Sequence, residues 1–180
     1  AIHRAKQMME LFEDRRNGGY FMTAFDGEQL IARPKETYDG AMPSGNSVAA
    51  MVLQTLASLT GEQKWQATAD RHLSFLAGEI REYPSASCFG VLAMMDALYP
   101  HRELVCAASD GMPEELKDYL KGHPADDLHV LLKNKENADI LSKLAPFTKD
   151  YPIPEQGTMY YLCENGACKA PVPEFSQLNL

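Results

Sequence analysis

The first hundred residues carry the apolar spacing of α-helices. Ile2, Ala5, Met9 and Phe12 recur at intervals of three or four residues, and this spacing predicts an amphipathic helix of about four turns. Two short apolar runs on either side of an Asp-Gly pair then predict a β-hairpin near residues 20–32.

Three further helices alternate between two kinds of pattern. Residues 45–60 leave almost no polar face, residues 62–82 carry a single apolar stripe, and residues 88–98 are again strongly apolar. A ring of helical hairpins requires this alternation, because its inner helices are covered on all sides while its outer helices need one apolar stripe. We therefore expect a mainly α chain in which residues 1–100 form a partial α/α toroid of helical hairpins. A four-helix bundle is the alternative that the same pattern leaves open.

The pattern changes in residues 101–180. Strand-type runs, helices and a hairpin follow one another there, which predicts a small α/β subdomain at the C-terminal end. The expected strands are 104–108 and 128–132, the expected helices are 114–121 and 138–144, and the hairpin joins 158–163 to 167–172 through Asn165-Gly166.

Composition and motifs argue against several classes of function. Acidic residues outnumber basic ones by 25 to 17, and the resulting net charge of −8 argues against a nucleic-acid-binding surface. No apolar run is long enough to span a membrane. The chain has no Cys-x-x-Cys pair, no glycine-rich nucleotide motif and no histidines at metal-ligand spacing, so we expect neither a metal nor another cofactor.

The cysteine content and the N-terminal residues bear on the origin of the chain. Four cysteines are few for a secreted domain held together by disulfides, which favours a cytoplasmic location. The chain lacks a starting Met and an apolar signal core, and we expect it to be a piece of a longer protein.

Candidate functional residues gather in two connectors, residues 16–44 and 83–87, that an antiparallel arrangement of helices brings to one end. The first connector, residues 16–44, is long, and long loops on a rigid scaffold often carry function. Asp39 is the candidate acid or base for catalysis. The candidate ligand-binding residues are Arg33, Tyr38, Ser44, Asn46, Ser85 and Ser87. The alternative is structural: Asp39 and Ser44 cap turns and helices, while Arg33 pairs with a carboxylate.

The two cysteines on either side of the predicted C-terminal turn are expected to face each other across the hairpin. In a two-residue hairpin, Cys163 and Cys168 form the non-hydrogen-bonded pair, with Cα atoms about 4.5 Å apart. That separation is compatible with a disulfide. A redox switch and a pair of reduced thiols packed against the layer both remain open.

Several segments together resemble a known family. The segments 31–35, 38–50, 59–62, 157–163 and 168–171 are similar to the C-terminal region of the thioredoxin-domain-containing family that includes spermatogenesis-associated protein 20. The resemblance implies an N-terminal thioredoxin-like domain followed by a six-hairpin α/α toroid, similar to N-acylglucosamine 2-epimerases and some glycosidases. This chain would hold the last hairpins and the tail. The histidine-based proton transfer of the epimerases has no counterpart in residues 33–46, which contain no histidine.

Two hypotheses about function follow. In the first, the intact protein binds or processes a carbohydrate-like, polyhydroxylated ligand at the connector end, and this fragment alone is inactive. In the second, the chain is a non-catalytic interaction module that serves the thioredoxin-like domain. The flanks of an incomplete ring would in either case favour a homodimer.

Overall fold

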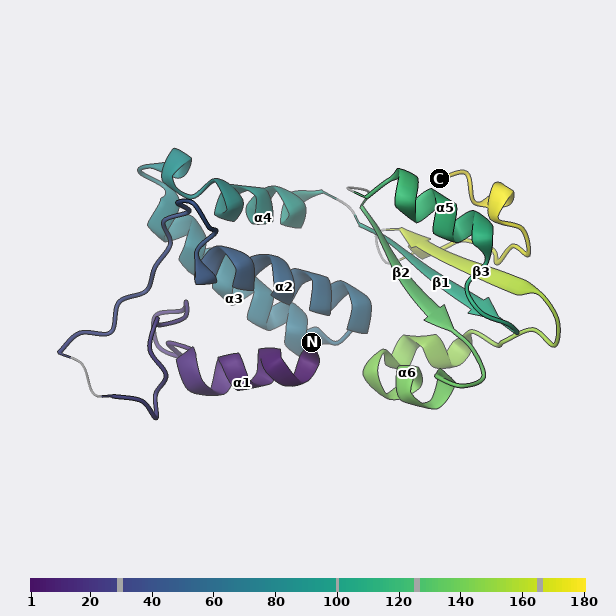
Figure 1. Ribbon diagram of the computed structural model, residues 1–180, viewed down its shortest axis with the longest axis horizontal. Coiled ribbons are helices and arrows are strands. Elements are labelled where there is room, and N and C mark those ends of the chain that lie inside the picture. The colour runs from purple at the N-terminus through teal and green to yellow at the C-terminus, as the bar shows by residue number, and fades with distance from the viewer. Residues whose placement is uncertain (29–30, 100, 125–126, 165–166) are drawn as a thin grey trace. The chain divides into compact units, whose positions relative to one another are not determined.

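The computed structural model describes residues 1–28, 31–99, 101–124, 127–164 and 167–180 (Figure 1). Within these ranges the chain has six α-helices and one four-stranded sheet. The chain divides into two compact units. The first contains Ala1–Ala57 and Gln63–Tyr99, and the second contains Ser58–Glu62 and Pro100–Leu180.

The first unit is helical. Its elements are α1 (Ile2–Phe12), α2 (Gly45–Thr60) as far as Ala57, α3 (Gln63–Ile80), the 3-10 helix η1 (Pro84–Ala86) and α4 (Cys88–Leu98). One apolar cluster joins α1, α2 and α3 around Leu53 and Trp65, and a second joins α2, α3 and α4 around Leu76 and Ala93. These clusters use the stripes that the spacing of apolar residues predicts for α1 and α3.

The turn after α1 depends on close contact with α3. Gly18 and Gly19 have φ values of +78° and +77°, in the left-handed region that favours glycine. A Cβ atom at Gly19 would overlap the ring of Phe75. Lys35 secures the same turn, because its Nζ donates to Asp14 Oδ2 at 2.9 Å and to the Gly18 carbonyl at 2.8 Å.

The second unit is built on a mixed sheet with strand order β2-β1-β3-β4. The strands are β1 (Arg102–Ala108), β2 (Leu128–Lys133), β3 (Thr158–Glu164) and β4 (Ala167–Cys168). Strands β1 and β2 are parallel, and β3 is antiparallel to both β1 and β4. The helix α5 (Glu114–Gly122) connects the parallel pair, as a parallel crossover requires.

Helical segments cover the two faces of this sheet (Figure 1). Helix α5 and the 3-10 helix η3 (Phe175–Leu178) pack on one face, around Leu104 and Leu162. The helix α6 (Ala138–Leu144) precedes η2 (Pro146–Asp150), and Phe147 of η2 packs on the other face with Val105 and Tyr161. Alternate residues of β1 and β3 therefore supply two separate cores.

The expectation of a mainly α, partial α/α toroid is wrong. The chain folds as a small α/β protein with six α-helices and a four-stranded mixed sheet in its described residues. The toroid interpretation required apolar helices that are covered on all sides. Helix α4 instead leaves Leu98 83% exposed, and α2 leaves Val48 40% exposed, so neither helix is enclosed in this way.

The two predicted hairpins have different outcomes. The hairpin expected near 20–32 falls partly on residues 29–30, outside the described residues, and its described parts, 20–28 and 31–32, contain no β-strand. The turn at residues 165–166 also lies outside the described residues. Its flanking strands pair in the predicted register, although β4 is only two residues long. Beyond it, Val172 forms an isolated bridge with Tyr160.

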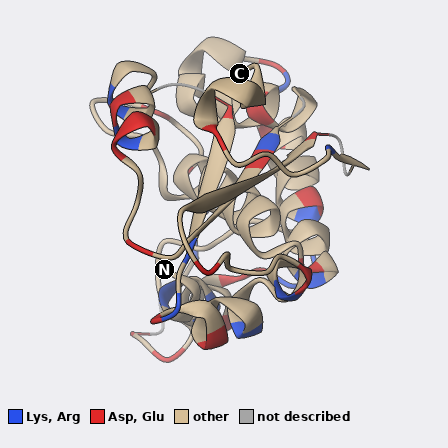
Figure 2. Cartoon of the chain, turned by 90° about the vertical axis from the view of Figure 1, so that its right-hand side faces the viewer, with Lys and Arg blue, Asp and Glu red and all other residues tan. Residues whose placement is uncertain are grey.

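Charged residues of both signs are interspersed on the helices in the view of Figure 2, in keeping with a net charge of −8. On α5, Lys117 pairs with Glu114 and Lys121 pairs with Asp118. Among the described residues, no helix has the length and apolar character needed to cross a membrane.

We expect alanine at Gly19 and alanine at Gly78 to have opposite effects on stability. Gly19→Ala places a Cβ in the left-handed region and against Phe75, which should lower the free energy of unfolding by at least about 1–2 kcal/mol. Gly78 lies inside α3 with open space around it, so Gly78→Ala should raise this free energy by about 0.5–1 kcal/mol. Urea denaturation measures both, and equal effects of the two substitutions would contradict the role of the Gly19 turn.

Candidate functional site

Asp39 connects the long loop to the beginnings of two helices. Its Oδ1 accepts a hydrogen bond from the Ser44 backbone N–H at 2.7 Å. Its Oδ2 accepts one from Ser47 Oγ at 3.1 Å and one from the Gly90 backbone N–H at 2.9 Å. Because Ser47 lies in α2 and Gly90 in α4, one carboxylate holds both N-terminal turns, where negative charge is favourable.

The surroundings of Asp39 make it a weak acid–base catalyst. Burial raises its pKa, but the hydrogen bonds from Ser44, Gly90 and Ser47 outweigh burial and hold the pKa below its usual value. The carboxyl group is therefore ionised at neutral pH and has no proton to donate. As a base it is weak, because both oxygens already accept hydrogen bonds.

Asn46 is a second structural connection. It is buried in the first turn of α2, and its Oδ1 accepts from the Tyr20 N–H at 2.7 Å. Its Nδ2 donates to the carbonyls of Tyr20 at 3.0 Å and Glu36 at 2.7 Å. His72 Nε2 lies 2.8 Å from the Asn46 carbonyl, so this ring nitrogen carries the proton and donates. Burial lowers the pKa of His72, which favours the neutral ring.

The candidate serines serve mainly to cap helices and to fix the loop. Ser44 Oγ accepts from the Ser47 N–H at 3.1 Å, which is the hydrogen bond of an N-cap residue. The same Oγ donates to Ser47 Oγ at 2.9 Å. Ser87 is buried, and its Oγ donates to the Thr37 carbonyl at 2.6 Å. Ser85 is exposed, and its carbonyl accepts from Cys88 Sγ at 3.3 Å.

Arg33 is held within its own loop. Its Nη2 donates to the Thr23 carbonyl at 2.6 Å, and its guanidinium carbon lies 4.2 Å from the centre of the Phe21 ring. Arg33 therefore makes a cation–π contact and a hydrogen bond to a backbone carbonyl. The structural alternative expected Arg33 to pair with a carboxylate, and the ring and the carbonyl take that place.

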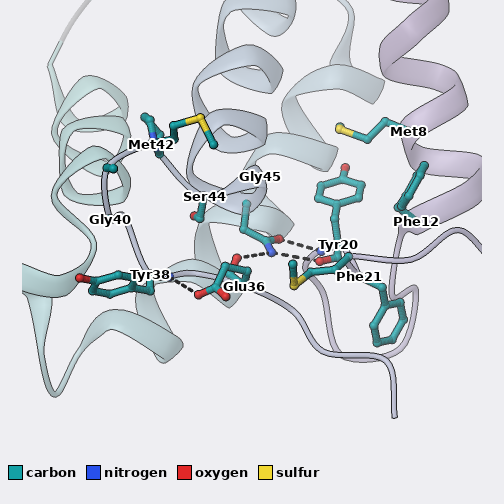
Figure 3. Close-up of a pocket in the computed structure, with 14 residues that line it drawn as sticks. Met8, Phe12, Tyr20, Phe21, Glu36, Tyr38, Gly40, Met42, Ser44 and Gly45 are labelled. Atoms are coloured by element: carbon teal, nitrogen blue, oxygen red, sulfur yellow. Dashed lines mark hydrogen bonds between the residues drawn. The ribbon is translucent and has the colours of Figure 1, made fainter. Parts of the chain in front are cut away.

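A pocket of about 660 Å³ lies beside this loop and is lined largely by apolar groups (Figure 3). Met8 and Phe12 reach it from α1, while Tyr38 and Met42 reach it from the loop. The remaining lining residues are Tyr20, Phe21, Met22, Glu36, Gly40, Ala41, Pro43, Ser44, Gly45 and Asn46. Met42 is 79% exposed and Tyr38 is 62% exposed, so two large apolar groups of this pocket face solvent.

The structure brings some of the candidate residues to the pocket and leaves others away from it. Tyr38, Ser44 and Asn46 line the pocket. Asp39, Arg33, Ser85 and Ser87 do not appear in its lining. Sequence reasoning missed the apolar residues of the lining, and the available signal was the run of large apolar residues at 20–22 followed by Met42 in an otherwise polar loop.

In the second unit the structure joins Cys163 and Cys168 in a disulfide, with an S–S distance of 2.10 Å and a Cα–Cα distance of 3.9 Å. The two residues lie opposite each other in the β3/β4 register. Cys88 and Cys106 are free thiols. Burial raises the pKa of Cys106 to about 12, so that thiol is unreactive at neutral pH. Over the described ranges, no three or more His, Cys, Asp and Glu side chains are grouped so that they could hold a metal ion.

The fold and site thus define a small α/β protein with an apolar pocket beside a tightly bonded loop. No family model matches the chain. Over 173 residues the chain is 28% identical to spermatogenesis-associated protein 20 of Rattus norvegicus, Mus musculus and Homo sapiens. The alignment covers 94% of this chain and 22% of each relative, so the chain spans about a fifth of the length of the curated relatives it matches. This similarity agrees with the resemblance noted in the sequence.

We expect Asp39→Asn to destabilise the protein in a pH-dependent way. At pH 7 the loss of charge-assisted hydrogen bonds should lower the free energy of unfolding by about 1.5–3 kcal/mol. Because the folded-state pKa of Asp39 lies below the unfolded value, its contribution is present above about pH 4. The contribution is lost as the pH falls through the folded-state pKa.

Urea denaturation of both proteins between pH 3 and pH 7 tests this expectation. The difference between wild type and Asp39→Asn should narrow toward the acid end of the range. A difference that is constant across the range, or absent at pH 7, would contradict the structural role of the carboxylate.

Proposed function

We propose that this chain is part of a longer protein related to spermatogenesis-associated protein 20 and acts there as a non-catalytic interaction module. Its pocket receives an apolar side chain of a polypeptide, and the partner is the thioredoxin-like domain implied by the family resemblance. One observation carries the proposal: the polar groups next to the pocket bond to one another, whereas the exposed lining is largely apolar, with Glu36 as its charged residue.

The hydrogen bonds of the loop count against a carbohydrate-like ligand. Sugar recognition requires donors and acceptors that are free to bond hydroxyl groups. Both carboxylate oxygens of Asp39 already accept hydrogen bonds from the protein. The side-chain oxygen and amide of Asn46 are likewise bonded to the backbone of Tyr20 and Glu36. Freeing these groups would break the loop anchorage at a cost of about 1 kcal/mol or more for each hydrogen bond.

The apolar lining suits a side chain from a protein. Met8, Met22 and Met42 are flexible and polarisable, so they adapt to apolar groups of different shape. A pocket of about 660 Å³ lies in the range that accommodates a drug-sized group or a few side chains. The exposed positions of Met42 and Tyr38 allow entry without unfolding of the loop. The alignment leaves nearly four-fifths of the length of each relative outside this chain, so partner segments are available within the longer protein.

We expect Met42→Glu to weaken association with the thioredoxin-like domain at least about tenfold, because a carboxylate would be buried against an apolar partner. Ile140→Glu is the matched control, since Ile140 is an exposed apolar residue of α6 that does not line the pocket. Isothermal titration calorimetry of this chain against the separately expressed domain measures the effect.

Two outcomes would overturn the proposal. One is equal binding by wild type and Met42→Glu. The other is calorimetric binding of sugars or amino sugars to the longer protein that Asp39→Ala abolishes while the fold remains intact, which would favour the carbohydrate hypothesis.

We also propose that the exposed apolar residues of α2 and α4 support a homodimer. Leu92, Met95 and Leu98 on α4, and Val48 and Val52 on α2, are exposed in the chain and would gain from burial. Light scattering should then give twice the monomer mass of 20.0 kDa at high concentration, and Leu92→Glu should shift the protein toward the monomer. A monomer at all concentrations would contradict this association.

A further inference from the structure

We propose that the Cys163–Cys168 disulfide is a thiol–disulfide exchange site, at which an external dithiol attacks the Cys168 sulfur while the Tyr151 hydroxyl stabilises the departing Cys163 sulfur. The site lies in the second unit and is independent of the pocket.

The two sulfurs differ in accessibility. Cys163 is 7% exposed in β3, whereas Cys168 is an exposed residue of β4. An incoming thiolate must approach along the S–S axis, opposite the bond that breaks. The exposed Cys168 is therefore the sulfur that it reaches, and Cys163 is the leaving group.

Tyr151 is placed to assist that departure. Its hydroxyl lies 3.4 Å from Cys163 Sγ and 3.2 Å from Cys168 Sγ. A disulfide sulfur accepts a hydrogen bond weakly, and a thiolate accepts one strongly, so the hydrogen bond strengthens as the S–S bond breaks. This is the kind of interaction that accelerates a reaction rather than one that only stabilises the resting state.

The position of the Tyr151 ring is set by its neighbours. The ring stacks on Tyr161 with centres 4.4 Å apart and meets Phe147 edge-on at 6.2 Å. Lys133, a buried residue of β2, donates through Nζ to the Tyr151 carbonyl at 2.8 Å. The hydroxyl therefore needs little reorganisation to reach the sulfurs.

The sheet register places a carboxylate beside the leaving sulfur. Glu103 of β1 lies directly opposite Cys163 of β3, and such pairs have Cβ atoms about 4.5–5.5 Å apart on one face. His129 of β2 lies opposite Glu103 on its other side, so one row across the sheet contains His129, Glu103, Cys163 and Cys168. Ser58 Oγ donates to Glu103 Oε1 at 3.1 Å.

Several titratable groups act on this row. Burial raises the pKa of Glu103. The hydrogen bond from Ser58 and the electrostatic interaction with His101 lower this pKa and offset part of the effect of burial. Burial raises the pKa of Tyr151, with Asp150 and Glu103 adding to the effect, so the phenol stays protonated as a donor. Lys133 contacts the same segment through its hydrogen bonds to the Thr148 and Tyr151 carbonyls, and His129 contacts Ser58.

The exchange balances as a two-electron transfer. One thiolate of the dithiol forms a bond to Cys168 Sγ, the Cys163–Cys168 bond breaks, and Cys163 leaves as a thiolate that takes a proton from water. The second thiolate of the dithiol then attacks the dithiol sulfur that is bonded to Cys168. This breaks the mixed disulfide and releases Cys168 as a thiolate, which also takes a proton from water. The dithiol is oxidised to a disulfide, and the protein gains two thiols.

Replacement of the tyrosine hydroxyl tests the assistance. We expect reduction of Tyr151→Phe by dithiothreitol, followed by alkylation and mass spectrometry, to be about three- to tenfold slower than reduction of the wild type. Tyr160→Phe is the control, because Tyr160 precedes Tyr161 in β3 and packs in the core on the opposite face of the sheet. Equal rates for Tyr151→Phe and wild type, or an equal slowing by Tyr160→Phe, would overturn the role of Tyr151.

The direction of attack has its own test. Brief treatment of the oxidised protein with reduced glutathione, quenched by alkylation, should leave glutathione on Cys168 in the mapped peptides. Glutathione on Cys163 instead would overturn the proposed direction, and alkylated Cys163 and Cys168 in the mapped peptides of protein equilibrated with oxidised dithiothreitol would overturn the exchange site itself. Cys88 and Cys106 are free in either state and are not counted.

The contribution of Glu103 is tested by the pH dependence of the rate at which the disulfide is reduced. A charged Glu103 repels the leaving thiolate, so Glu103→Gln should be reduced faster than wild type at pH 8, by about three- to tenfold. The ratio of the two rates cancels the ionisation of the dithiol. It should fall toward one as the pH drops through the pKa of Glu103. A ratio that does not change with pH would remove Glu103 from the site.

Discussion

The first unit depends on one carboxylate. Asp39 accepts hydrogen bonds from Ser44, Ser47 and Gly90, and it thereby fixes the long loop to the beginnings of α2 and α4 at once. Gly90 makes this contact feasible, because a Cβ there would stand 3.0 Å from Ser47 Oγ and 3.3 Å from Leu76 Cδ2. At α4 the carboxylate accepts a backbone N–H of the first turn directly, whereas at α2 it holds Ser44, whose Oγ accepts the Ser47 N–H.

This arrangement determines what the pocket can be. Buried polar groups must be bonded, and a loop of irregular backbone has many of them. Here Asp39, Asn46 and Ser87 meet that demand and turn their polar atoms inward. The loop then presents a largely apolar edge to solvent, with Met42 and Tyr38 at its surface and Glu36 as the exposed charged residue of the pocket. The polar residues that suggest catalysis in the sequence are therefore the ones whose hydrogen bonds fix the loop beside the pocket.

Local geometry made part of this structure predictable. The helices α2 and α3 follow apolar spacings that lie within one segment, and Cys163 and Cys168 pair in the register that the sequence spacing predicts. The pocket joins residues from α1 to residues of the long loop, and no local pattern connects them. The toroid interpretation failed for a related reason. An apolar helix face does not specify what covers it, and Leu98 of α4 is in fact exposed.

The second unit shows how a sheet assembles chemistry that the sequence keeps apart. Val105, Ala107 and Tyr161 form an apolar face, and the polar row of His129, Glu103 and Cys163 lies at one end of that same face. Placing a carboxylate next to a disulfide on a partly buried surface costs desolvation energy, which packing alone does not explain. A purely structural disulfide would be served as well by an apolar neighbour at position 103. Two polar groups beside the disulfide therefore act on its reduction in opposite directions: the Tyr151 hydroxyl stabilises the thiolate that leaves, and a charged Glu103 opposes its formation.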